Sequence, residues 1–155
     1  MNDLTSKVVI YTDGACAGNP GPGGWGALLQ FNGTSKEIFG HELDTTNNRM
    51  EITAAIEALK ILQKPCHVEI YTDSKYLQQG ITEWIHKWIK NNWCKSNNEP
   101  VKNVDLWQNL YEELKKHDII WKWVRGHASN KGNIAADRLA VQGRQTAIKI
   151  LKCRG

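Results

Sequence analysis

The pattern of apolar and polar positions divides the chain into short apolar runs and longer amphipathic stretches. Runs rich in β-branched and aromatic residues predict five strands, at 7–11, 25–31, 37–43, 67–71 and 119–124. Apolar residues that recur every three or four positions predict helices at about 49–63, 73–80, 81–92 and 105–116, and from about 134. The first three strands form a meander, and the later strands alternate with helices. This order indicates a single α/β domain.

The first and fourth predicted strands share the same four residues, Ile-Tyr-Thr-Asp, which end at Asp13 and Asp73. The helix predicted between the two copies could connect them as neighbours in one sheet. Neighbouring strands lie about 4.8 Å apart, so the two carboxylates would nearly touch and would repel each other. A divalent cation would relieve this repulsion, and hard oxygen ligands favour Mg²⁺ or Mn²⁺.

Positions 14–24, directly after Asp13, are rich in glycine and proline, which is typical of a turn or loop. The sequence lacks the Gly-x-x-x-x-Gly-Lys-Ser/Thr motif of phosphate-binding loops. We therefore interpret the segment as a tight reversal of the chain. Asn32 and Gly33 then join two strands as a hairpin turn.

Glu51 lies near the start of the helix predicted at 49–63 and has two interpretations. Asn48 and Glu51 have the spacing of a capping box, in which both residues satisfy free backbone N–H groups. Glu51 also shares a helix face with Ala54, Ala55 and Leu62, so its carboxylate points toward the core side, where an anion needs a cation. From these residues alone, a role of Glu51 in a helix cap and a role as a metal ligand are equally open.

Asp137 is a further carboxylate directed inward, because it lies among Ala136, Ala140 and Val141 on the last predicted helix. The complete set of acids is Asp13, Glu51, Asp73 and Asp137. Two metal ions about 3.5–4 Å apart need several bridging and terminal carboxylates, and they suit in-line displacement at a phosphodiester. The four acids together therefore indicate a two-metal site for phosphodiester chemistry.

Composition and charge favour a compact protein with an anionic partner. The 155 residues include 20 Lys and Arg against 16 Asp and Glu, and no acidic residue follows Asp137. The basic tail at 144–155 is either solvated or in contact with nucleic acid.

The four cysteines lack zinc-ligand spacing and are expected to be reduced. With no signal peptide and no apolar run of membrane-spanning length, we expect a cytoplasmic protein without membrane contact, one domain over 1–155.

Tryptophans and lysines alternate in and after the helix predicted at 81–92. Trp84 and Trp88 have the helical spacing of an ordinary core stripe, the role that we favour for Trp84. Lys87 and Lys90 lie between and after them. Aromatic residues interleaved with cations could also stack on nucleic-acid bases or sugars and follow the phosphate backbone.

Four separated motifs occur in order along the chain: Tyr-Thr-Asp-Gly-Ala at 11–15, Thr-Thr-Asn-Asn-Arg-Met-Glu at 45–51, Tyr-Thr-Asp-Ser at 71–74, and Gly-His-Ala at 126–128. Over a core of about residues 7–143, the sequence resembles ribonuclease H type 1, the bacterial ribonuclease HI form. The resemblance implies a ribonuclease H-like fold, a five-stranded mixed sheet in the order 3-2-1-4-5 flanked by helices. It also implies an endonuclease that cleaves the RNA strand of RNA-DNA hybrids and leaves 5′-phosphate and 3′-hydroxyl ends.

The resemblance further implies roles for individual residues. The four acids would bind two Mg²⁺ ions, for which Mn²⁺ could substitute, and His127 would assist proton movement or product departure. Residues 84–101 correspond to the family's basic protrusion. The implied contacts to the RNA strand are Cys16, Asn19, Asn47, Asn48 and Gln79. The candidates for contact with the DNA strand are Thr46, Trp84, Lys87, Trp88, Lys90, Lys95, Lys102 and Asn103.

Three features depart from the family's pattern. Asp44 stands where an arginine can support the DNA-phosphate pocket, Ile134 replaces an acidic residue, and asparagines make the protrusion less basic.

Three other functions are less well supported by the sequence. A hybrid-binding module without activity would lack at least one of the four acids, and all four are present. An integrase or resolvase is disfavoured by the asparagines before Glu51 and by the protrusion. Met1 and the compact length favour a free-standing monomer over a detached reverse-transcriptase domain.

Overall fold

The structure is a computed structural model that describes residues 7–125 and 130–154. Its five strands are β1 Lys7–Cys16, β2 Gly21–Phe31, β3 Thr34–Thr45, β4 His67–Thr72 and β5 Asp118–Trp123. β2 is antiparallel to both β1 and β3, whereas β4 is parallel to both β1 and β5. The sheet order β3-β2-β1-β4-β5 confirms the expected order 3-2-1-4-5.

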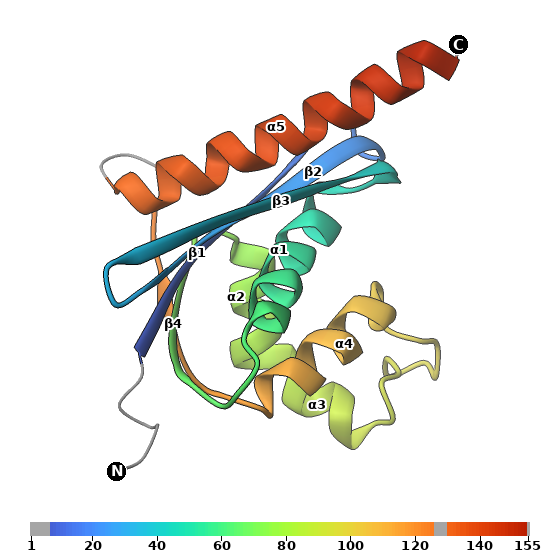
Figure 1. The fold of residues 1–155 in the computed structure, drawn as a ribbon. Helices are drawn as coiled ribbons and strands as arrows, with labels where there is room; N and C mark the ends of the chain where they lie inside the picture. The colour runs from blue at the N-terminus through green and yellow to red at the C-terminus, as the bar shows by residue number, and fades with distance from the viewer. Residues whose placement is uncertain (1–6, 126–129, 155) are drawn as a thin grey trace.

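Helices cover both faces of the sheet (Figure 1). They are α1 Asn47–Ile61, α2 Lys75–Gln79, the π-helical turn η2 Gly80–Trp84, α3 Ile85–Lys90, α4 Val104–Leu114 and α5 Lys131–Arg154. α1 to α4 lie on one side of the sheet, and α5 crosses β1, β2 and β3 on the other. Among the helices of the described residues, none is long and apolar enough to cross a membrane.

The main core lies between the sheet and α1. Val8 and Ile10 alternate along β1 with residues that point to the other face, as expected for a strand covered on both sides. The apolar stripe of α1, which includes Ile52 and Ile56, packs against them. α4 closes this layer with Trp107, which is fully buried. The packing fixes the first turn of α1 beside β1, the position from which Glu51 extends.

Positions 14–24 are mostly strand, which corrects the expected loop. β1 continues to Cys16 and β2 begins at Gly21, so the reversal is confined to 17–20. The glycines are needed because α5 lies directly on the backbone of β2. A Cβ on Gly24 would overlap the backbone of Arg144, and one on Gly26 would lie 2.6 Å from the backbone nitrogen of Ala140. Glycines at these two positions thus let α5 lie close to the backbone of β2.

Of the two interpretations left open for Glu51, the capping box with Asn48 is wrong. α1 begins at Asn47, and its N-cap is Thr46, whose Oγ1 accepts a hydrogen bond from the backbone N–H of Arg49 at 3.2 Å. Asn48 therefore lies inside the first turn of the helix, where its side chain is exposed. The third position of the helix is Arg49, so Glu51 lies two residues too late to complete a capping box. One of its carboxylate oxygens lies instead within 4.8 Å of oxygens from Asp13 and Asp73.

Candidate active site

The parallel pairing of β1 with β4 brings Asp13 and Asp73 to equivalent positions. Tyr11 lies opposite Tyr71 in the register, and their rings stack with centroids 4.8 Å apart. The aspartates follow two residues later in each copy of the repeated motif. Glu51 approaches from the first turns of α1, and one oxygen each from Asp13, Glu51 and Asp73 lies within 4.8 Å of the others.

Gly14 allows this convergence. A Cβ at position 14 would lie 2.7 Å from the backbone nitrogen of Glu51 and 2.8 Å from the carbonyl carbon of Met50. Real Cβ atoms essentially never come within 3.0 Å of another heavy atom in this way. Only glycine therefore lets α1 lie close enough to β1 for the carboxylate of Glu51 to reach Asp13.

Burial and like charge disfavour the ionised forms of these acids. Burial, followed by the charge of Asp73, raises the pKa of Asp13 to about 8. Burial, followed by the charge of Asp13, raises the pKa of Glu51 well above its ordinary value. The backbone N–H of Gly14 donates to Asp13 Oδ1 at 2.9 Å and offsets only part of this cost. A cation between the carboxylates would reverse both effects.

Glu51 also retains an acceptor that the protein does not use. Within residues 7–125 and 130–154, its buried Oε1 has no hydrogen-bond partner. The residue is only 6% exposed, so bulk water reaches it poorly. A buried carboxylate oxygen of this kind, beside two further carboxylates, is a suitable ligand for a hard divalent ion.

Asp137 reaches the same place from the opposite face of the sheet. It lies on α5, which passes over Gly26, the residue paired with Asp13 in the β1–β2 ladder. A side-chain hydrogen bond with Asp137, together with its charge, contributes to the raised pKa of Asp13. The four acids thus come from β1, α1, the end of β4 and α5.

A groove of about 630 Å³ opens beside Asp73, between the ends of β4 and β5 and the start of α2. Its lining includes Lys75 and Arg125, two exposed cations that the sequence analysis missed. Lys75 opens α2 only two residues after Asp73. This spacing was the available signal, since a cation so close to a candidate metal ligand can hold a substrate phosphate.

Four of the residues expected to contact RNA lie around the start of α1. Asn19 Oδ1 accepts a hydrogen bond from the backbone N–H of Asn47 at 3.0 Å, which joins the β1–β2 turn to the helix. Cys16 Sγ lies 3.5 Å from the carbonyl oxygen of Thr45, the residue before the cap. Asn48 follows in the first turn with an exposed side chain. Gln79 stands apart from this group, exposed at the end of α2.

Asn103, a candidate for DNA contact, is held by a chain of side-chain hydrogen bonds. Its backbone is left-handed, with φ of 60°. Arg49 donates to Asn103 Oδ1 at 3.1 Å and to both carboxylate oxygens of Asp105, at 3.1 and 2.8 Å. Asn103 Nδ2 in turn donates to the hydroxyl of Tyr76 at 3.1 Å. Because Arg49 follows the cap Thr46 by three residues, it connects the two residues expected to hold a DNA phosphate.

The role of Arg49 is not evident from the sequence. A cation in the first turn of a helix is unfavourable beside the positive end of the helix dipole. An arginine at this position therefore calls for an acidic partner, although the sequence does not indicate which one. The structure supplies Asp105, more than fifty residues away in the chain.

The tryptophans of the protrusion serve packing and still face solvent. Trp84 and Trp88 are half-buried, with ring centroids 5.7 Å apart, and Trp88 lies 5.3 Å from Trp107. They also line a groove of about 310 Å³ together with Lys102. Lys87 and Lys90 are exposed on α3. His127, the remaining candidate, lies outside the described residues.

This sheet order, with helices on both faces and acids at adjacent strand ends, defines the ribonuclease H-like class of α/β proteins. The chain belongs to the ribonuclease H family, since the RNase H family model matches residues 5–145. It is 87% identical to a ribonuclease H of Rickettsia bellii over 155 residues, which cover 100% of both chains. It is 84% identical to a ribonuclease HI of Rickettsia conorii over 152 residues, 98% of this chain and 100% of the relative. The expected family is confirmed.

Solved structures agree with this assignment. LC9-RNase H1, a type 1 RNase H with the type 2 active-site motif, superposes with a TM-score of 0.82 at 33% identity, over 92% of this chain and 74% of the other. An N-terminal RNase H domain from Mycobacterium tuberculosis gives a TM-score of 0.72 at 26% identity, over 94% and 99%. LC11-RNase H1, solved in complex with RNA/DNA hybrid, gives 0.70 at 23% identity, over 91% and 99%, which shows a common fold.

Proposed function

We propose that this chain is an endoribonuclease that hydrolyses the RNA strand of RNA-DNA hybrids with the help of two divalent metal ions, leaving 5′-phosphate and 3′-hydroxyl ends. One observation carries the proposal: carboxylate oxygens of Asp13, Glu51 and Asp73 lie within 4.8 Å of one another. The relatives named ribonuclease H, 87% identical in one case, support the activity. The hybrid bound to LC11-RNase H1 supports the substrate.

The residues present suit divalent cations. Asp13, Glu51, Asp73 and Asp137 would hold the two ions, and their hard oxygens favour Mg²⁺, with Mn²⁺ as a substitute. A positive charge at this position would give the unpartnered Oε1 of Glu51 a partner and would lower the raised pKa of Asp13, so that both groups bind as carboxylates. When bound, such ions supply an activated water and stabilise charge on the leaving oxygen.

The start of α1 is suited to hold the RNA strand. Asn47 and Asn48 are exposed, and amide side chains can both donate to a phosphate and pair with a 2′-hydroxyl. The 2′-hydroxyl is the group that distinguishes RNA from DNA at a given site. Asn19, bonded to the first residue of α1, extends this polar surface into the β1–β2 turn. The segment therefore orients the strand that is cut.

The protrusion and Asn103 are suited to hold the DNA strand. Trp84 and Trp88 offer partly exposed ring faces for sugars or bases, and Lys102 lines the same groove. The amide of Asn103, fixed by Arg49 and Tyr76, would contact a DNA phosphate together with Thr46. His127 would move a proton near the leaving group, since an imidazole titrates near neutral pH.

A cleavage assay tests the proposal. Labelled RNA-DNA hybrid, duplex RNA and duplex DNA are incubated with and without Mg²⁺, using the wild-type chain and Asp13→Asn. We expect only the hybrid to be cut, only on its RNA strand, only with metal and only by the wild type. Asp118→Asn, at the exposed start of β5 and at the other end of the strands from the acids, serves as the control and should retain activity. Undiminished turnover by Asp13→Asn would refute the metal assignment.

A further inference from the structure

The C-terminal part of α5 extends beyond the sheet that the rest of the helix covers (Figure 1). We call residues 144–154 the basic arm. The segment carries no acidic residue, and its cations are Arg144, Lys149, Lys152 and Arg154. Lys149, Lys152 and Arg154 are exposed. The arm therefore presents positive charge that no neighbouring acid along the helix neutralises.

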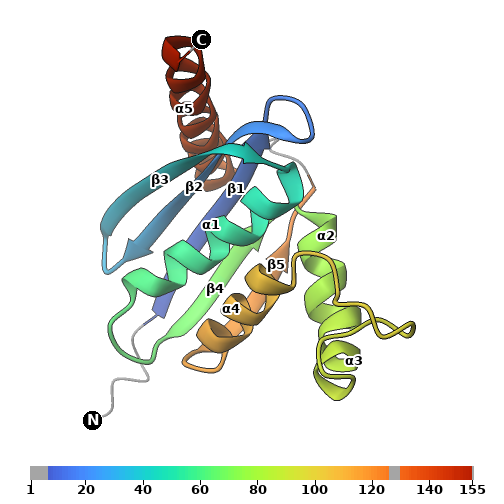
Figure 2. The same cartoon turned by 90° about the vertical axis from the view of Figure 1, so that its right-hand side faces the viewer.

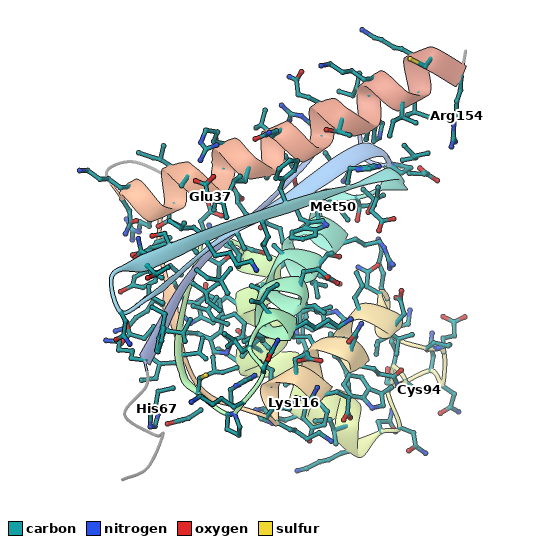
Figure 3. All side chains as sticks on the ribbon, in the orientation of Figure 1. Glu37, Met50, His67, Cys94, Lys116 and Arg154 are labelled. Carbon is teal, nitrogen blue, oxygen red and sulfur yellow. The ribbon has the colours of Figure 1, made fainter. Side chains whose placement is uncertain are left out.

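The arm projects on the same side of the molecule as the protrusion. In Figure 3, the labelled Arg154 and Cys94 lie at the right-hand ends of the two projections, with Met50 of α1 between them. Figure 2 views this side directly, with the end of α5 at the top, the starts of α1 and α2 below it and the loop after α3 lower still. The arm and the protrusion thus lie on either side of the start of α1.

The base of the arm lies near Cys16, one of the residues proposed to face RNA. The backbone of Arg144 lies directly on Gly24 of β2, where a Cβ would overlap it. Burial raises the pKa of the Cys16 thiol, and the charge of Arg144 acts in the opposite direction. Arg144 is therefore close enough to act electrostatically on a residue of the candidate RNA surface, and the remaining cations continue outward from it.

The length of the arm suits a nucleic-acid duplex. At about 1.5 Å per residue, Lys149 and Arg154 lie roughly 18 and 26 Å beyond Asp137 along the helix axis. Each strand of a duplex carries a phosphate about every 3.4 Å of its axis, so this distance corresponds to roughly five to eight phosphates. A duplex that runs from the active site in the direction of α5 would therefore reach the arm within one helical turn of its own.

The arm also adds positive charge to that of the protrusion, part of which an acid neutralises. Lys95 in the protrusion is paired with Glu99 at 3.4 Å, and asparagines occupy positions 91, 92, 97 and 98. Exposed apolar atoms of Leu151 would suit a second copy of this chain instead. The uninterrupted positive charge and the shared side favour a polyanion, because like-charged arms of two copies would repel each other.

We propose that the basic arm is a second grip on the hybrid, in which Lys149, Lys152 and Arg154 contact backbone phosphates on the side of the active site away from the protrusion. This inference rests on the proposed function and adds a binding surface to it. Its contacts are to phosphates, so they strengthen binding without selecting a base sequence. They also leave the chemistry at the four acids unchanged.

Two variants with the same change of net charge test the arm. The arm variant combines Lys149→Gln, Lys152→Gln and Arg154→Gln. The control combines Lys36→Gln, Lys60→Gln and Lys64→Gln, exposed positions at the start of β3 and the end of α1, far from the acids. Circular dichroism verifies that both variants keep the helix content of the wild type.

Hybrid binding is measured by fluorescence anisotropy over a range of salt concentrations, in an Asp13→Asn background that prevents cleavage. If all three cations contact phosphates, the slope of log K against log salt becomes shallower by roughly two to three in the arm variant, and affinity at about 0.1 M salt falls roughly tenfold. The control should keep the slope of the parent. With Asp13 intact, the arm variant should show a raised KM and an unchanged kcat.

Equal salt slopes for the arm variant and the control would overturn the arm as a binding surface. The mass of each chain in solution gives a second test. If the parent is a dimer, the arm variant is a monomer and both bind the hybrid equally well, then the arm serves self-association and the proposed grip on the hybrid is overturned. Failure of the wild-type chain to cut the hybrid is a separate result. It would refute the proposed function, whereas the binding comparison would still report on the arm.

Discussion

Replacing Asp13 with asparagine should stabilise the folded chain when divalent metal is removed, although the same change should abolish cleavage. The carboxyl is 5% exposed and lies within 4.8 Å of oxygens from Glu51 and Asp73. Without a cation, ionised carboxylates at this distance repel each other in surroundings that water reaches poorly. Asparagine keeps nearly the same shape and removes one charge from the cluster.

The size of the effect follows from the pKa of Asp13. Its rise from 3.8 to about 8 means that the folded state holds this proton more tightly than the unfolded state. Stability therefore falls as pH rises between these two values and is constant above about 8. Four pKa units at about 1.4 kcal/mol each set an upper bound of about 6 kcal/mol. Relaxation and water penetration reduce such penalties, and we expect about 1–3 kcal/mol at pH above 8.

The assay is thermal unfolding in a metal chelator, at pH 5 and pH 9, for the wild type, Asp13→Asn and the exposed control Asp44→Asn. For a chain of this length, about 1–3 kcal/mol corresponds to a rise in Tm of roughly 3–9 °C for Asp13→Asn at pH 9. The gain should shrink at pH 5, where the wild-type carboxyl is protonated. The control should shift stability by less than about 0.5 kcal/mol at either pH.

Added Mg²⁺ should make the wild type more stable than Asp13→Asn. Metal that binds only the folded state raises its stability, and the wild type has the full set of acids to bind it. We expect Mg²⁺ to raise the Tm of the wild type and to leave Asp13→Asn nearly unchanged. A variant that is less stable than the wild type at pH 9 in chelator, or one whose gain does not depend on pH, would refute charge repulsion at this site.

Three further predictions concern other parts of the chain. Gly80→Ala places a Cβ against the buried indole of Trp107 and should lower the free energy of unfolding by about 1–3 kcal/mol, measured by urea denaturation; a neutral result would show that the indole can move aside. Arg49→Met removes the hydrogen bond that orients Asn103 and should weaken hybrid binding by about 1–2 kcal/mol. It should raise KM more than it lowers kcat, and an equal fall in kcat would contradict a positioning role. His127→Ala should slow cleavage without abolishing it, and an unchanged pH–rate profile would remove its proposed role.

The sequence predicted the sheet because its strongest signals are local. The repeated Ile-Tyr-Thr-Asp motif marks two strands, and their parallel register then places Asp13 and Asp73 together. The helical spacing around Glu51 likewise predicted that its side chain lies on the core side of the helix. In these cases one element determines its own buried face. The order of the five strands was implied by the family resemblance instead, and the structure confirms it.

The features that the sequence did not reveal depend on contacts between distant elements. Positions 14–24 looked like a loop because strand propensity does not record that α5 needs bare backbone at Gly24. The N-cap of α1 is Thr46, although the sequence Thr-Thr-Asn-Asn at 45–48 offers four plausible cap residues. Tertiary packing decides among them. The bond from Arg49 to Asp105 joins residues with no shared local pattern.

The crossing of α5 over the glycines of β2 has a consequence for how loss of activity would look in related genes. A methyl group at position 24 or 26 would push the helix outward, and Asp137 would move with it. Such a chain would keep every ionisable group of the wild type and still be inactive. A survey that scores only whether the acids persist would count it as a working enzyme.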